Sequence, residues 1–249
     1  MREKSAPAIR DTLLNPAAIY ILSALFVPRA AMVLARAFLP AAGLDFPPAV
    51  RDAAAAGAAL LAQGAALIAI TLSHVTGPRG LGLSVRVLGL SADRWLSRAG
   101  QGLAAGLALL LVNIVGSRVA VLVFEALLGE EAVARHVDRE RAVTALFQLE
   151  LPPAVLALLF VGSVLVAPLS EELFFRGYVH GVLRARLGSR AAYASAAAFA
   201  AAHAYVVHFL PLFFIGLLLA RLYERTGTLV APMAAHAVVN LAVAVSLRL

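Results

Sequence analysis

The stretch that decides the fold is residues 167–177, APLSEELFFRG, because it places two carboxylates and a guanidinium inside a long apolar run. On a helix, Glu172 and Arg176 are four residues apart and share a face, so we expect them to form an ion pair. Glu171 points about 100° away around the same helix and has no such partner there. We therefore expect Glu171 to face another helix or water.

The composition around this stretch is typical of a membrane protein. Of the 249 residues, 62% are hydrophobic and only 14% are charged, whereas a soluble domain is about 45–50% apolar and about 25% charged. The net charge of +7 is concentrated in short segments between apolar runs. Such segments are typical of cytoplasmic membrane loops, so we expect a lipid bilayer as the partner and no nucleic acid. The sequence has no cysteine, which excludes disulfides and thiolate metal sites.

Apolar segments occupy most of the chain, and they predict an all-α, polytopic transmembrane bundle of about seven spans. The first is the weakest because Pro28, Arg29 and Arg36 interrupt it, so whether it spans stays open; we interpret it as a retained span and not as a signal peptide. The seven segments lie at about 16–38, 53–75, 100–128, 153–187, 190–207, 209–223 and 229–247.

Two connectors of opposite charge predict the orientation. Residues 77–98 are basic, and we interpret them as an interfacial segment or short amphipathic helix with Trp95 at headgroup depth. Residues 129–150 are rich in acidic groups and predict a polar loop or helix on the other side. The positive-inside rule then places residues 77–98 and the turn at 184–190 in the cytoplasm, with a cytoplasmic N-terminus in a cell membrane.

Other polar side chains occur at a similar depth in two later segments. His203 lies in the fifth segment, and His236 and Asn240 lie four residues apart in the seventh. At about 1.5 Å per residue from the expected cytoplasmic ends, these side chains and the two glutamates are all about 12–20 Å deep. They therefore predict one polar layer, although a structural ion pair and bundle-packed histidines would produce the same pattern. His180, one turn beyond Arg176, is expected to be a wet structural residue.

Three motifs in order resemble those of the CPBP family, which includes the type 2-like CAAX prenyl proteases and the bacteriocin-processing Abi proteins. The resemblance covers residues 153–245 and implies a type II CAAX protease-like fold. Residues 1–150 match the family only as generic apolar spans. We expect N-terminal transmembrane helices at 1–150 and catalytic helices at 151–249, in one continuous membrane domain. The motifs are Glu171-Glu172-x-x-x-Arg176, Phe199-x-x-x-His203 and His236-x-x-x-Asn240.

The resemblance also implies an activity, that of an intramembrane endopeptidase that hydrolyses a peptide bond near the membrane interface. Its substrate would be a peptide or protein at the membrane. By position, Glu171 would activate water and His203 would help hold that water or the substrate. The remaining motif residues would stabilise the oxyanion (His236 and Asn240) or support the site (Glu172 and Arg176).

A metal and two other functions remain open from the sequence. If a divalent metal such as zinc is present, Glu171, His203 and His236 are the expected ligands. The chain has no H-E-x-x-H helix, and we expect no obligatory metal. A transporter or channel, or a non-catalytic substrate-binding membrane protein, would use the same polar groups.

Overall fold

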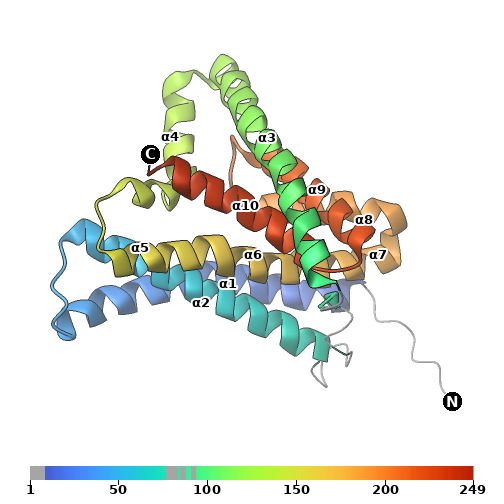
Figure 1. The fold of residues 1–249 in the computed structure, drawn as a ribbon, viewed down its shortest axis with the longest axis horizontal. Helices are drawn as coiled ribbons and strands as arrows, with labels where there is room; N and C mark the ends of the chain where they lie inside the picture. Colours follow the sequence, from blue (N-terminus) through green and yellow to red (C-terminus); the bar gives the residue numbers. More distant parts are fainter. Residues whose placement is uncertain (1–8, 77–83, 85–87, 91–93, 249) are drawn as a thin grey trace.

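The computed structural model describes residues 9–76, 84, 88–90 and 94–248. Within these residues every regular element is helical (Figure 1), as the sequence predicts. The N-terminal part contains α1 (Ile9–Ala41), α2 (Pro48–Thr76), α3 (Trp95–Leu128), α4 (Glu130–Glu140) and the 3₁₀ turn η2 (Thr144–Gln148).

The C-terminal part begins with one long helical run that changes type along its length. The α-helices α5 (Pro153–Phe160), α6 (Ala167–Glu172) and α7 (Gly181–Leu187) alternate with the π-helical segments η3 (Val161–Val166) and η4 (Leu173–His180). A 3₁₀ turn, η5 (Gly188–Arg190), then leads to α8 (Ala191–Ala202), α9 (Phe209–Thr226) and α10 (Val230–Ser246).

Each of the seven predicted apolar segments contains a helix or a consecutive run of helices. The fifth, at 190–207, extends beyond α8 into the turn that follows Ala202 and includes His203. The sequence left a polar loop or a helix open for the acidic connector, and the structure shows helices there, α4 and η2. Most of the predicted interfacial segment at 77–98 lies outside the described residues, and Trp95 begins α3.

The described helices have the length and surface of a multi-pass membrane protein. Three helical runs are long and apolar enough to cross a bilayer, and α10 is a shorter apolar helix. One face of α3 exposes a continuous series of large hydrophobic side chains to the surroundings, a surface that suits lipid and would be costly in water. That series includes Leu103, Leu107, Leu111, Ile114, Val115, Val119, Leu122 and Val123.

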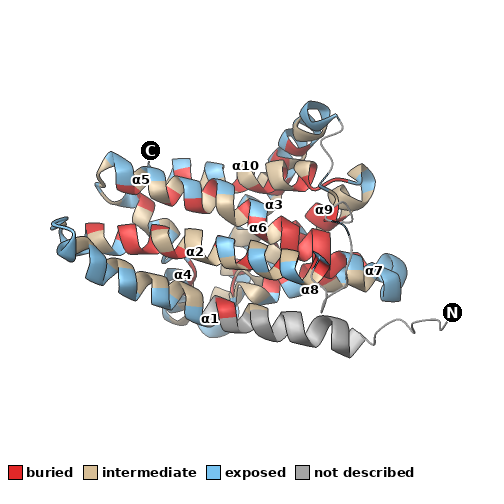
Figure 2. Ribbon diagram, turned by 90° about the horizontal axis from the view of Figure 1, so that it is seen from below, coloured by how far each residue is buried: buried red, intermediate tan, exposed pale blue. Residues whose placement is uncertain are grey.

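Buried residues are concentrated where α6, α8 and α9 meet (Figure 2). All eight residues of η4 are buried, and among them Phe174 and Phe175 contact Tyr20 from α1. The ring of Phe175 also packs edge-on against Phe199 from α8, with 5.3 Å between ring centres. An aromatic core therefore fixes the helix that carries both glutamates.

A close helix crossing positions α10. Gly102 and Gly106 lie four residues apart on α3, an arrangement that lets transmembrane helix backbones approach. A Cβ atom at residue 102 would lie 2.3 Å from the backbone oxygen of Ala231 in α10, far inside van der Waals contact. Because α10 carries His236, this crossing helps set where that side chain lies.

We predict that Gly102→Val separates α3 from α10 and lowers the free energy of unfolding by about 1–3 kcal/mol, the usual cost of overpacking. Gly100→Val is the matched control, because a Cβ atom there meets nothing within 4 Å. Reversible unfolding in detergent or in a bilayer measures the free energy of unfolding of both variants. An equal loss of this free energy in the two would contradict the close contact at Gly102.

Candidate active site

Glu172 and Arg176 form an ion pair at the centre of the bundle, as predicted, and neither side chain is exposed. Arg176 Nη1 donates to Glu172 Oε1 at 2.8 Å, and its Nη2 donates to the backbone oxygen of Gly216 in α9 at 2.9 Å. The guanidinium carbon also lies 4.4 Å from the ring centre of Phe199. Buried charges persist in proteins when such partners surround them, so this pair ties η4 to α6, α8 and α9.

His236 joins this pair from α10. Its Nδ1 lies 2.9 Å from Glu172 Oε1, the same oxygen that Arg176 contacts. An ionised carboxylate can only accept hydrogen bonds, so Nδ1 carries the hydrogen and Nε2 is the free nitrogen of the ring. Glu172 is therefore the residue at which the first and third sequence motifs meet.

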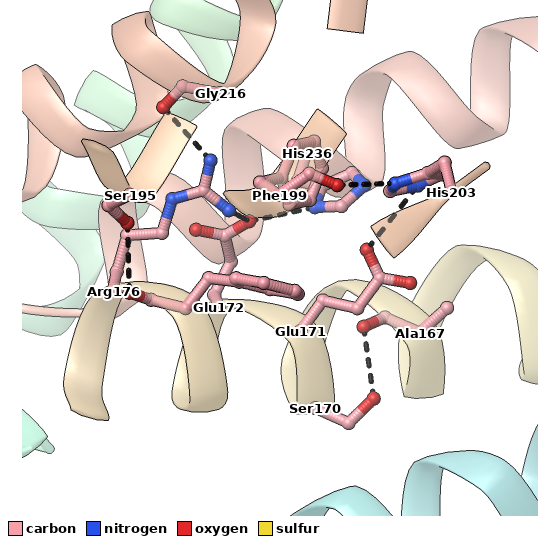
Figure 3. A network of polar contacts seen from close by, with 11 residues as sticks. Ala167, Ser170, Glu171, Glu172, Arg176, Ser195, Phe199, His203, Gly216 and His236 are labelled. Atoms are coloured by element: carbon pink, nitrogen blue, oxygen red, sulfur yellow. Dashed lines mark hydrogen bonds and ion pairs between the residues drawn. The ribbon is translucent and has the colours of Figure 1, made fainter. Parts of the chain in front are cut away.

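Glu171 precedes Glu172 on the same helix and points toward His203 (Figure 3). Its Oε2 is 3.9 Å from His203 Nε2 and has no hydrogen-bond partner among the described residues. The Nδ1 atom of His203 donates to the backbone oxygen of Phe199 at 2.9 Å, which leaves Nε2 directed toward the carboxylate. The two side chains are 23% and 24% exposed, so both are partly accessible from outside the bundle. The sequence left another helix or water as what Glu171 faces, and in the structure it faces the turn that follows α8.

The sequence comparisons agree with this geometry. Residues 153–242 match the family model described as type II CAAX prenyl endopeptidase Rce1-like. This C-terminal segment is therefore similar to the type II CAAX prenyl endopeptidases over about a third of the chain. No curated protein and no solved structure shows a significant match to the chain. The similarity supports an intramembrane protease in general.

Asn240, the last residue of the third motif, makes a structural hydrogen bond. Its Nδ2 donates at 2.8 Å to the backbone oxygen of Ser163 in η3. That carbonyl lacks its usual helical donors, because the Ala167 N–H bonds to Gly162 in the π-helical register and Pro168 has no N–H. Asn240 thus satisfies a carbonyl that the π-to-α transition leaves free.

A metal does not fit the candidate site as it is built. Among the described residues, no three His, Asp or Glu side chains lie close enough together to hold an ion. The three residues expected to bind a metal if one were present lie in two separate contacts, because His236 is bonded to Glu172 while His203 faces Glu171.

His180 departs from the expectation of a wet side chain. It is only 2% exposed, and its Nε2 lies 3.4 Å from Glu224 in α9. Glu224 is also bound by Arg184 and Arg221, so this acidic residue connects α9 to η4 and α7. The prediction was wrong because α9 covers a face that, judged from η4 alone, continues toward the cytoplasmic end.

Glu140, at the end of α4, is a buried polar residue that the sequence does not reveal. Its carboxylate accepts the backbone N–H groups of Val206, Val207 and His208, and it also contacts His208 Nδ1. Burial raises the pKa of Glu140, but these hydrogen bonds outweigh burial and hold it below the ordinary carboxyl value. Its stabilising effect is therefore present above that ordinary value and is lost as the pH falls through the lowered one.

We predict that Asn240→Ala lowers the free energy of unfolding by about 1–3 kcal/mol, because it leaves the Ser163 carbonyl without a donor. Asn240→Asp is the matched variant, since it keeps the side-chain shape and removes the donor. Unfolding measurements on both variants should show a loss of stability. Unchanged stability in both would mean that this hydrogen bond contributes nothing to the fold.

Proposed function

We propose that this chain is an intramembrane endopeptidase in which Glu171 activates a water molecule for attack on a peptide bond. The observation that carries the proposal is the pairing of a partner-free Glu171 Oε2 with His203 Nε2 at 3.9 Å. That distance is too long for a direct hydrogen bond. A water molecule placed between the two atoms would bond to both. It would also give Glu171 Oε2 the hydrogen-bond partner that this buried atom otherwise lacks.

In the proposed reaction, Glu171 removes a proton from this water as the oxygen attacks the carbonyl carbon of the substrate. The tetrahedral intermediate then breaks at its C–N bond, and the proton held by Glu171 passes to the leaving amine. His203 Nε2 orients the water, because its other nitrogen is held by the Phe199 carbonyl. Atoms and charge balance without any further reactant.

We assign oxyanion stabilisation to His236 in its doubly protonated form. Because Nδ1 donates to Glu172, Nε2 can donate to an oxyanion only when it also carries a hydrogen. Asn240 has a second amide hydrogen beyond the one given to Ser163, and this hydrogen is its proposed contribution. Glu172 and Arg176 hold His236 in place.

The proposed substrate is a peptide or protein at the membrane, as the family description suggests for this segment. We propose that residues 1–150 and 151–249 act as one membrane domain, since α2 packs against α5 and α6 and α3 packs against α9 and α10. The basic turn at 184–190 favours a cytoplasmic location for that end of the bundle and for the N-terminus.

Glu171→Gln tests the proposal. We predict that it lowers the cleavage rate at least about 100-fold, the usual contribution of a general base, while the protein still inserts and folds. Glu131→Gln is the matched control, because the Glu131 side chain is 90% exposed on α4 and pairs with Arg135 in the same helix. Mass spectrometry of membrane peptides measures cleavage products.

Full cleavage by the Glu171→Gln variant would overturn the role of Glu171. An absence of cleavage products from the unsubstituted protein would favour a transporter or a binding protein that uses the same polar groups.

A further inference from the structure

We propose that Glu140 is a positioning residue for His203, which it controls through the turn between α8 and α9. This inference rests on the proposed function. Residues 203–208 form the turn, which begins at His203 and ends at the first turn of α9. Glu140 comes from a different part of the chain, at the end of α4, and its side chain is only 5% exposed.

The carboxylate of Glu140 accepts the backbone hydrogen bonds that the C-terminal half of this turn donates. Its Oε1 accepts the N–H groups of Val206 at 2.7 Å and Val207 at 2.9 Å, and its Oε2 accepts the N–H group of His208 at 3.2 Å. His208 Nδ1 contacts the same Oε2. One side chain therefore provides the acceptors for three consecutive backbone donors just before α9.

Packing beneath the carboxylate holds the same turn. Val207 is completely buried, and it lies in a small cluster with Val133 of α4 and Ala120 of α3. The α3–α4 pair thus contacts the turn in two ways, through the Glu140 carboxylate and through the apolar cluster around Val207. Both contacts lie within five residues of His203.

Backbone strain in the turn favours a change of conformation when the Glu140 carboxylate is removed. Ala204, directly after His203, has a φ of 55°, a left-handed conformation that is unfavourable for a residue with a Cβ atom. Such residues persist where the surrounding structure holds them. The Glu140 hydrogen bonds provide that restraint, so their removal lets Ala204 relax and shifts the imidazole of His203.

Tyr205 lies between the Glu140 contact and the candidate active site. Its ring is edge-on to that of His203, with 5.7 Å between ring centres. The turn that Glu140 contacts therefore also contacts the imidazole of His203 through this ring.

Glu140→Gln tests the proposal with Glu131→Gln as its matched control on the same helix. The glutamine keeps one acceptor oxygen and presents an NH₂ group to donors that need an acceptor. We expect kcat to fall about 100-fold with KM unchanged, since Glu140 does not contact substrate and the reacting groups are displaced by about 1 Å. Adding Ala204→Gly should restore kcat roughly tenfold, because glycine adopts the left-handed conformation without strain.

A second measurement does not depend on activity. The chain has no cysteine, so Val207→Cys introduces a single thiol at a completely buried position. A membrane-permeant maleimide should label this thiol slowly in the otherwise unsubstituted chain and with Glu131→Gln, and at least tenfold faster with Glu140→Gln, as the turn opens.

Faster labelling with reduced kcat and rescue by Ala204→Gly supports the proposal. Labelling that does not change with Glu140→Gln overturns it, and so does faster labelling with the kcat of the Glu131→Gln control. A loss of kcat that Ala204→Gly does not restore would show general destabilisation and would also overturn it. If the unsubstituted protein cleaves nothing, the proposed function fails and the positioning role with it, while labelling still reports whether Glu140 holds the turn.

Discussion

A carboxylate without access to solvent is the constraint on which the rest of the structure depends. Glu172 is fully buried, and a buried charge costs several kcal/mol unless partners neutralise it. Its partners come from different helices, because Arg176 follows one turn later, His236 comes from α10, and Arg176 also bonds to the Gly216 carbonyl of α9. Neutralising one charge therefore brings four elements together, and the positions of the motif residues follow from it.

The same constraint divides the roles of two adjacent glutamates. Neighbouring residues on a helix point about 100° apart, so when Glu172 faces the ion pair Glu171 must face elsewhere. It faces His203, and its side chain is 23% exposed whereas Glu172 is fully buried, which is the reason to assign it the chemistry. Of these two neighbours, Glu172 provides the buried charge that holds the helices together, and Glu171 provides a carboxylate that is available to water.

Much of this arrangement was predictable, because helical periodicity and the cost of charge in lipid are local properties of the sequence. They predicted the helices and the Glu172–Arg176 pair, and they predicted that Glu171 would face away from that pair, toward another helix or water. Contacts between distant segments were not predictable from periodicity. Glu140 lies 66 to 68 residues from the N–H groups it accepts, and the need of Ser163 for Asn240 arises from a π-helical register that the sequence does not show. His180 was misjudged because its burial depends on α9.

The central claim is that the buried ion pair is energetically coupled, and a double-mutant cycle of Glu172→Gln and Arg176→Gln tests it most directly. Removal of either charge alone should cost about 3–5 kcal/mol of unfolding free energy, because the other charge stays buried without its partner. The account predicts that the double variant loses at least about 1 kcal/mol less than the sum of the single losses. Additive losses, as expected for the exposed Glu131–Arg135 pair, would contradict it.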